Sequence, residues 1–275
     1  MLYIITYTTH SSGYFPLIED HPDLKILGFG DQWSSWFHRT QAILKFCNSL
    51  SDNDLLCCID GFDTVFNQCG YHLVREISER FKNYNCDILF SLDRKSKTAI
   101  EEYLIRRKFG KCFGHLLNAG LYIGKPRKIE KFWEDLQIDD DDQRYAAHRC
   151  HVVQDTISVK VDSDQTIFLN YNDDEYYVRD ERLILTYSGS SPTIISGPAK
   201  KDLSKIIKDL NLTKCPHVKV TSVDNILKHN KKQESILSRS LSAIKKDATN
   251  IPKYFDFEFA LILFIILLCI IFLFV

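Results

Sequence analysis

The feature that most constrains the fold of this chain is an alternation of short apolar runs with longer amphipathic segments. The apolar runs have the length of strands and occupy residues 2–7, 24–27, 54–59, 87–91, 117–123 and 156–161. Segments with helical periodicity separate them, at residues 36–50, 71–84, 98–108, 129–136 and 142–150. Buried strands that alternate with helices pack as a mostly parallel sheet with helices on its faces. The pattern therefore predicts an α/β fold.

The composition indicates a packed body and excludes several classes of protein. The chain of 275 residues contains 35 Lys and Arg against 36 Asp and Glu, so its net charge is -1. This balance excludes a strongly basic nucleic-acid binder, and a hydrophobic share of 45% excludes a disordered chain. The nine cysteines are scattered, odd in number and without paired CxxC spacing. We therefore expect neither a disulfide framework nor a structural zinc site.

The last part of the chain predicts a membrane anchor. Residues 259–275 are seventeen consecutive apolar residues without a charge, Gly or Pro. A helix of this length is just long enough to cross a thin bilayer. The expected organisation is a folded body at residues 1–215, a basic stalk at 216–254 and a C-terminal transmembrane helix at 255–275.

The flanks of this anchor predict its orientation. Basic residues outnumber acidic ones at 228–253, and residues 1–10 lack the features of a signal peptide. Positive charge beside a membrane span favours the cytosolic side, so we expect a single-pass protein whose body faces the cytosol. The same basic stretch suits both a solvated linker and a segment that rests on anionic headgroups.

An acid pair follows the third apolar run. Asp60 and Asp63 stand just after residues 54–59, at the carboxyl end of a buried strand, where open α/β sheets place their sites. Two carboxylates separated by a short turn can hold one hard divalent cation, which in turn binds a diphosphate. For either aspartate alone, a turn residue that caps the next element is the alternative. Haloacid-dehalogenase-type phosphatases also carry an acid pair before a Thr, but their acids are spaced more closely and follow the first strand, so we set that class aside.

Two further segments place small or acidic residues next to the predicted strands and helices. In the run LLNAGLYIG, at residues 116–124, Asn118 and Gly120 allow a backbone to approach a ligand closely. A glycine at a packing contact between strands explains that run equally well. Residues 139–142 are four consecutive aspartates directly before a helix. One or two acids suit the first turn of a helix, but four repel one another, which suggests that one or more face a cation or a sugar. A solvated loop explains the run equally well.

Taken in order, five segments resemble the glycosyltransferase domain of the procollagen lysyl hydroxylases and of their relatives in large DNA viruses. That family has an apolar strand ending in D-x-x-D, then F-S-A/S-x, L-N-S-G-x-x-I-G, a poly-Asp run with Gln, and an I-F-Q/L-N strand. The corresponding segments here are IDGFD, FSLD at 90–93, LNAGLYIG, DDDDQ and IFLN at 167–170. Their order and spacing hold from about residue 28 to residue 210.

The resemblance implies a GT-A-type, Rossmann-like nucleotide-sugar-binding domain at residues 1–215. Such a domain transfers a hexose, galactose or glucose, from a UDP-sugar to a hydroxyl group of a protein or glycan acceptor, with hydroxylysine as one candidate. The cofactor that the resemblance implies is Mn²⁺, and no nucleic acid is expected as a partner.

The resemblance also assigns roles by position. Asp60 and Asp63 would be the metal ligands, and Asp141 and Asp142 would be catalytic residues at the transferred sugar. The residues that would bind the nucleotide sugar are Arg39, Asp60, Asn118 and Gly120.

Two departures from the family pattern bear on activity. The family has a His-Gly-Asn-Gly-Pro segment whose His completes the metal site, whereas this chain has Ile194 at that position and Ser196 in place of the Asn. Ile has no atom that can ligate a cation. The Cys-Trp-Pro segment that follows the F-S strand in the family is also absent. Two functions therefore stand side by side: an active, membrane-tethered transferase, and a weak or inactive transferase fold that acts as a membrane-tethered sugar- or partner-binding module.

Overall fold

The computed structural model describes residues 1–70, 72–93, 99–198 and 201–219. All of them belong to one compact unit, called the first unit below. Within the described ranges, no helix is long and apolar enough to cross a bilayer. The apolar run at 259–275, predicted to be the anchor, and almost all of the predicted stalk lie outside those ranges.

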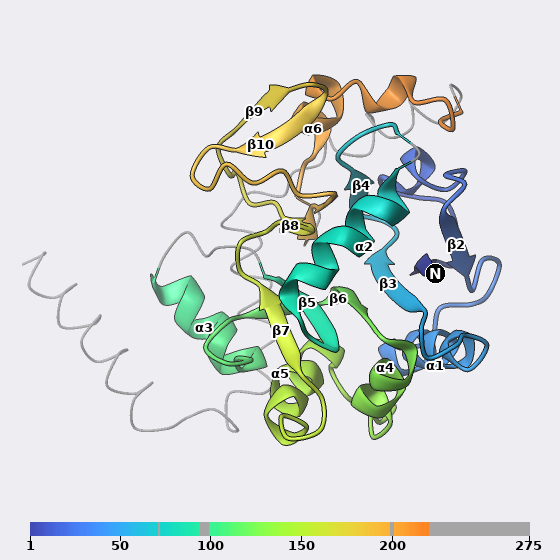
Figure 1. Ribbon diagram of the computed structural model, residues 1–275, viewed down its shortest axis with the longest axis vertical. Helices are drawn as coiled ribbons and strands as arrows, with labels where there is room; N and C mark the ends of the chain where they lie inside the picture. Colours follow the sequence, from blue (N-terminus) through green and yellow to red (C-terminus); the bar gives the residue numbers. More distant parts are fainter. Residues whose placement is uncertain (71, 94–98, 199–200, 220–275) are drawn as a thin grey trace, which may run out of the picture. The chain divides into compact units, whose positions relative to one another are not determined.

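A six-stranded sheet forms the centre of the first unit (Figure 1). Its strands lie in the order β2 (Leu24–Leu27), β1 (Leu2–Tyr7), β3 (Leu55–Asp60), β6 (Leu117–Gly124), β5 (Ile88–Leu92) and β7 (Val159–Asp162). β1 pairs in parallel with β2 and β3, and β5 pairs in parallel with β7. β6 runs antiparallel to both of its neighbours. The other five strands of this sheet run in one direction, so the predicted α/β fold with a mostly parallel sheet is confirmed.

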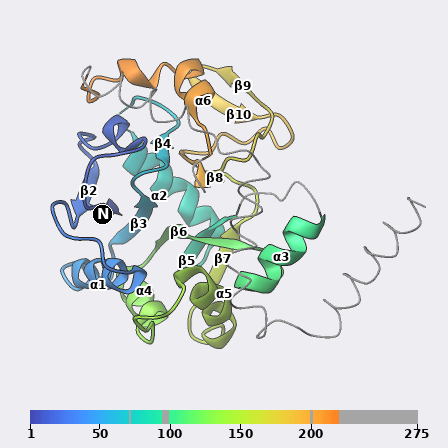
Figure 2. The ribbon, with the colours of Figure 1, turned by 180° about the vertical axis from the view of Figure 1, so that it is seen from behind.

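The strands are apolar on both faces because each face is covered. The adjacent residues Cys57 and Cys58 are both buried but belong to different hydrophobic cores. Cys57 shares its core with α2 (Leu73–Tyr84), and Cys58 shares the other core with three helices. These helices are α1 (Trp36–Cys47), α4 (Pro126–Trp133) and α5 (Asp142–Val152), which lie together in both views (Figures 1 and 2). A further helix, α3 (Ala99–Phe109), contacts α5.

Three short strands form a second sheet on the α2 side. Its order is β4 (Thr64–Phe66), β11 (Ile194–Ser196) and β8 (Phe168–Asn170). β11 pairs antiparallel with β4 and parallel with β8, and its last register row joins three polar residues, Thr64, Ser196 and Asn170. All three are almost fully buried. This sheet therefore ends in a buried polar row, although its interior is apolar.

The C-terminal part of the unit adds a hairpin and short helical segments. β9 (Tyr176–Arg179) and β10 (Arg182–Leu185) pair antiparallel around Asp180 and Glu181. Both turn residues have positive φ, as a two-residue hairpin turn of the favoured twist requires. The remaining segments are α6 (Ser204–Asp209) and the 3-10 turns η1 (Phe15–Leu17) and η3 (Leu212–Lys214).

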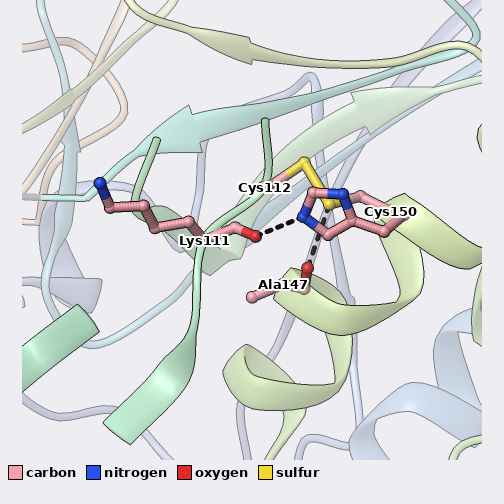
Figure 3. The surroundings of a disulfide bond; sticks show 5 residues. Lys111, Cys112, Ala147 and Cys150 are labelled. Carbon is pink, nitrogen blue, oxygen red and sulfur yellow. Dashed lines mark hydrogen bonds between the residues drawn. A yellow bond between two sulfur atoms is a disulfide. The ribbon is translucent and has the colours of Figure 1, made fainter. Parts of the chain in front are cut away.

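Two disulfides correct the expectation drawn from the cysteine pattern. Cys69–Cys215 joins the segment after β4 to the residue after η3, across 146 residues. Cys112–Cys150 joins the turn before β6 to the last part of α5 (Figure 3). The expectation that disulfides are absent was wrong because the spacing of cysteines along the chain does not show which of them the fold brings together. The fold brings their Cα atoms to within 5.0 and 5.9 Å.

Removing the longer-range disulfide is expected to destabilise the first unit. In the Cys69→Ser/Cys215→Ser variant the unfolded chain regains the freedom of a long loop, which lowers the free energy of unfolding by about 3–5 kcal/mol. Urea unfolding of the oxidised wild type and of the variant measures this difference. Cys86→Ser alters a free, half-buried thiol and is expected to stay within about 1 kcal/mol of the wild type. Equal stability of the double variant and the wild type would show that this disulfide does not form.

Candidate active site

The carboxyl end of β3 places Asp60 where the strand order of the main sheet reverses. β2 lies on one side of β1 and β3 on the other, and Asp60 pairs in register with Tyr7, the last residue of β1. Ligands of open α/β sheets bind at such a point. From the other side β6 brings Gly120 against the carboxylate, since a Cβ atom on Gly120 would lie 1.9 Å from Asp60 Oδ2. The sequence suggested that Gly120 admits a ligand; the structure shows that it makes room for Asp60.

A buried arginine lies between two of the predicted site carboxylates. α1 begins behind the N-cap residue Ser35 and presents Arg39 one turn later. Arg39 Nη2 lies 3.0 Å from Asp60 Oδ1, and its Nη1 lies 3.5 Å from Asp142 Oδ2. Nη2 also donates to the carbonyl of Gly120, at 3.3 Å. Burial alone would lower the pKa of Arg39, but Asp60 and Asp142 raise it above its ordinary value, so the guanidinium stays charged.

The run of four aspartates divides between helix capping and the site. Asp141 is the N-cap of α5, and its carboxylate accepts a hydrogen bond from the backbone N–H of Arg144 at 2.9 Å. Asp141, for which the resemblance implies a catalytic role, thus caps the helix. Asp142, the next residue, contacts Arg39. Burial raises the pKa of Asp142 to about 6, against the opposing effect of Arg39.

Asp63, the second residue of the acid pair, is partly buried and interacts electrostatically with Asp60. Burial raises the pKa of Asp63 to about 7, and the neighbouring carboxylate of Asp60 adds to the increase. The hydroxyl of Ser196 donates to Asp63 Oδ1 at 3.2 Å. Ile194, at the position of the family's His, is fully buried in β11 between β4 and β8. The strand therefore brings a hydroxyl group, not an imidazole, to the acid pair.

Asn118 supports the site from within the protein. It is 8% exposed, and its Oδ1 accepts from the backbone N–H of Gly120 at 2.7 Å. Its Nδ2 donates to Asn170 Oδ1 at 3.1 Å. Asn170 in turn donates to Ser91 Oγ at 3.0 Å. Nothing in the sequence indicated Ser91, Ser196 or Asn170 as a residue of the site. The IFLN motif contains Asn170, but no spacing along the chain shows which buried groups its side chain meets.

The ligand atoms of the acid pair suit a hard divalent cation. Asp60 and Asp63 offer carboxylate oxygens, and Ser196 adds a hydroxyl beside Asp63. Oxygen ligands are those that Mg²⁺ and Mn²⁺ prefer. Across the described part of the chain, no group of three or more His, Cys, Asp or Glu side chains could hold a metal ion. The kind of ligand therefore fits such a cation, and oxygens from a bound substrate or water would have to complete its coordination.

The fold and the site together define the class of protein. Ligands of open α/β sheets bind at the switch point, where the acid pair lies, and arginine is a frequent partner of phosphate groups. The family model described as the PLOD GT domain matches residues 20–210. The chain belongs to this family, the glycosyltransferase domain of the procollagen lysyl hydroxylases, and is a glycosyltransferase. The match confirms the resemblance drawn from the five sequence motifs.

Several solved structures are similar to this chain at low identity. The galactosyltransferase LgtC in complex with donor and acceptor sugar analogs is 12% identical, with a TM-score of 0.38, and the match covers 81% of this chain and 99% of LgtC. An active-site mutant of LgtC is 11% identical, with a TM-score of 0.37 and coverage of 76% and 95%. Protein A197 from STIV is 14% identical, with a TM-score of 0.36 and coverage of 70% and 93%. No curated protein sequence matches the chain.

Gly120→Ala is expected to disable the site while the fold persists. The new Cβ atom would lie 1.9 Å from Asp60 Oδ2, so the carboxylate must move away from Arg39. Such overpacking costs about 1–3 kcal/mol of stability, and a comparable loss of binding energy lowers the affinity for UDP in the presence of Mn²⁺ by about tenfold or more. Calorimetric titration measures that affinity. Gly70→Ala is the matched control, because its new Cβ makes only an ordinary contact, 3.8 Å from Gln68. If Gly120→Ala binds UDP with the affinity of the wild type, the placement of the site at Asp60 is refuted.

Proposed function

We propose that this glycosyltransferase moves a hexose, galactose or glucose, from a UDP-sugar to a hydroxyl group of a protein or glycan acceptor. The observation that carries the proposal is the cluster of Asp60, Arg39 and Asp142 at the carboxyl end of β3. Membership of the PLOD GT domain family supports the class of donor and of acceptor. Hydroxylysine is the protein acceptor that the family suggests.

The reaction needs positive charge at the leaving group. The acceptor hydroxyl oxygen forms a bond to the anomeric carbon and gives up its proton to a carboxylate. The bond between that carbon and the diphosphate oxygen breaks, and its electron pair leaves with UDP. Arg39 holds a permanent charge in the cluster, since Asp60 and Asp142 raise its pKa. Asp60 and Asp63 are the residues that would hold Mn²⁺, which when bound stabilises negative charge on the diphosphate.

Asp142 is the residue placed to act on the sugar or on the acceptor. Its carboxylate lies at the N-terminus of α5, 3.5 Å from the Arg39 guanidinium. With a pKa of about 6, it is ionised near neutral pH and still able to take a proton from an acceptor hydroxyl. In a reaction that retains configuration, the same carboxylate would instead stabilise oxocarbenium character, by analogy with glycoside hydrolysis.

A second candidate function follows from Ile194. Because the family's His ligand is replaced by a fully buried isoleucine, cation binding has one protein ligand fewer than in the family. This observation favours a weak or inactive transferase fold that binds a sugar or a partner while tethered to a membrane. The two candidates differ in one measurable property, since the binding module binds UDP-sugars without turning them over.

Turnover by the full chain in detergent tests the proposed function. We expect UDP release from UDP-galactose or UDP-glucose that depends on Mn²⁺, and a decrease of kcat by about 100-fold or more in Asp142→Asn. Asp139→Asn is the matched control, because Asp139 belongs to the same acidic run but is exposed. Equal rates for both variants would exclude Asp142 from the chemistry. Binding without turnover in the wild type would favour the binding module.

Calorimetry with UDP and Mn²⁺ tests the acid pair directly. Asp60→Ala/Asp63→Ala is expected to abolish the part of UDP affinity that depends on Mn²⁺, whereas Asp139→Asn retains it. Burial raises the pKa of Asp63 to about 7. Protons therefore compete with the cation below that pH, and the Mn²⁺-dependent affinity of the wild type is expected to fall as the pH decreases from 7 to 5. Metal-dependent affinity that survives in the double variant would refute this assignment.

We also propose that residues 259–275 anchor the enzyme in a membrane with its body on the cytosolic side. The uncharged apolar run and the basic residues at 228–253 support this orientation. The disulfides Cys69–Cys215 and Cys112–Cys150 point the other way, since disulfides persist in oxidising compartments. Protease digestion of sealed vesicles that carry the full chain separates the two orientations: digestion without detergent supports a cytosolic body, and protection overturns it.

A further inference from the structure

A buried network of polar side chains links the small sheet to the main sheet behind the acid pair. Asn170, at the end of β8, donates from Nδ2 to Ser91 Oγ at 3.0 Å and to the carbonyl of Leu92 at 2.6 Å. Its Oδ1 accepts from Asn118 Nδ2 at 3.1 Å. Ser91, Asn118 and Asn170 are 0%, 8% and 1% exposed, respectively. The side-chain amide of Asn170 is therefore held at both of its ends, away from solvent.

The network lies where the pairing of β5 with β6 is irregular. Phe90 pairs with Tyr122, whereas the next residue, Ser91, pairs with Asn118. The three residues of β6 between Asn118 and Tyr122 therefore have no partner on β5 in this register. A bulge of this kind leaves ladder groups unsatisfied and re-aims the strand. Asn170 bonds to both strands beside this bulge, because its Nδ2 donates to Ser91 and Leu92 of β5 and its Oδ1 accepts from Asn118 of β6.

The bulged residues of β6 carry the backbone that touches the site. Asn118 Oδ1 accepts from the backbone N–H of Gly120, at 2.7 Å. The carbonyl of Gly120 in turn accepts from Arg39 Nη2, at 3.3 Å. Arg39 pairs with Asp60 and Asp142. A continuous series of hydrogen bonds and ion pairs thus runs from Asn170 to the site carboxylates.

We infer that Asn170 is a positioning residue for the transfer reaction: it fixes the bulge that holds Gly120 and, through Gly120, the place of Arg39 between its two carboxylates. Asn170 does not itself touch the carboxylates. The effect on rate rests on the proposed function, whereas the effect on Gly120 does not. Because a displacement of about 1 Å in a site can cost about 100-fold in rate, a side chain that reaches Arg39 through Asn118 and Gly120 can set the rate without meeting the substrate.

Asn67 provides a matched control with the same chemistry in another place. It is 2% exposed, and its Oδ1 accepts from the backbone N–H of Leu183 at 2.7 Å. Its Nδ2 donates to the carbonyls of Leu183 and Pro192 and to the hydroxyl of Ser191. These partners belong to the β10 strand and the loop before β11. Removing either asparagine amide leaves buried backbone groups unsatisfied, but only the Asn170 series leads to Gly120.

The experiment compares Asn170→Ala, Ser91→Ala and Asn67→Ala in the full chain. The first readout, which needs no substrate, is the hydrogen exchange of the Gly120 amide, whose bond to Asn118 reports on the bulge. The second is kcat and KM for UDP-hexose turnover with Mn²⁺. We expect Gly120 to exchange about tenfold faster in Asn170→Ala than in Asn67→Ala. We also expect kcat to fall by about 10-fold to 100-fold with KM changed by less than about threefold.

Ser91→Ala removes one acceptor of Asn170 with little loss of volume, so it is expected to move both readouts in the same direction by a smaller amount. It also keeps the test decisive if Asn170→Ala does not fold. The inference is overturned if Gly120 exchange and kcat change no more in Asn170→Ala or Ser91→Ala than in Asn67→Ala. If the wild type shows no turnover while Gly120 exchange still separates the variants, the proposed function fails and the structural role of Asn170 stands.

Discussion

The site depends on one buried charge, the guanidinium of Arg39. It joins α1 to β3 through Asp60, to α5 through Asp142 and to β6 through the carbonyl of Gly120. A buried ion pair contributes little net stability, because the loss of hydration offsets most of the attraction between the charges. Losing one partner is nevertheless costly, at about 3–5 kcal/mol, because the other charge stays buried. The main effect of Arg39 is therefore to fix the positions of β3, α5 and β6 relative to one another, and its contribution to the stability of the fold is small. This indicates a role in the site.

The charges of this cluster do not balance within the protein alone. With Asp60, Asp63 and Asp142 ionised, three negative charges face the one positive charge of Arg39, which leaves a net charge of −2. Burial, with repulsion from Asp60, raises the pKa of Asp63 to about 7 and that of Asp142 to about 6. Both carboxyl groups therefore hold a proton more readily than exposed aspartates. A divalent cation would supply the missing two charges, which is the electrostatic argument for the metal that the family resemblance implies.

Local patterns in the sequence were enough to predict where several strands and helices lie and where along the fold the acid pair stands. The predicted runs at 2–7 and 24–27 coincide with β1 and β2, and Asp60 stands at the end of β3 as expected. Strand direction was not readable, because a strand buried on both faces, such as β6, has the same apolar pattern whichever way it runs. The strands β4, β8 and β11, each of three residues, are too short for a period to be seen. Contacts between distant residues could not be predicted either, because local sequence does not identify a partner far along the chain. Nothing near Cys69 indicates Cys215 as its partner, and nothing near Ser196 indicates Asp63.

The replacement of the family's His by Ile194 has a structural meaning that the sequence comparison alone does not give. Residues two apart on a strand point to the same face, so Ile194 and Ser196 share the face of β11 on which Ser196 reaches Asp63. On this face the isoleucine joins the hydrophobic core, fully buried, and the row that closes the small sheet keeps its polar side chains, Thr64, Ser196 and Asn170. In β11 an apolar side chain therefore stands at the position of the family's His ligand, while the polar residues at the end of the strand are present. That end contacts Asp63 through Ser196 and the β6 strand through Asn170, so these contacts to the site are made without the family's His.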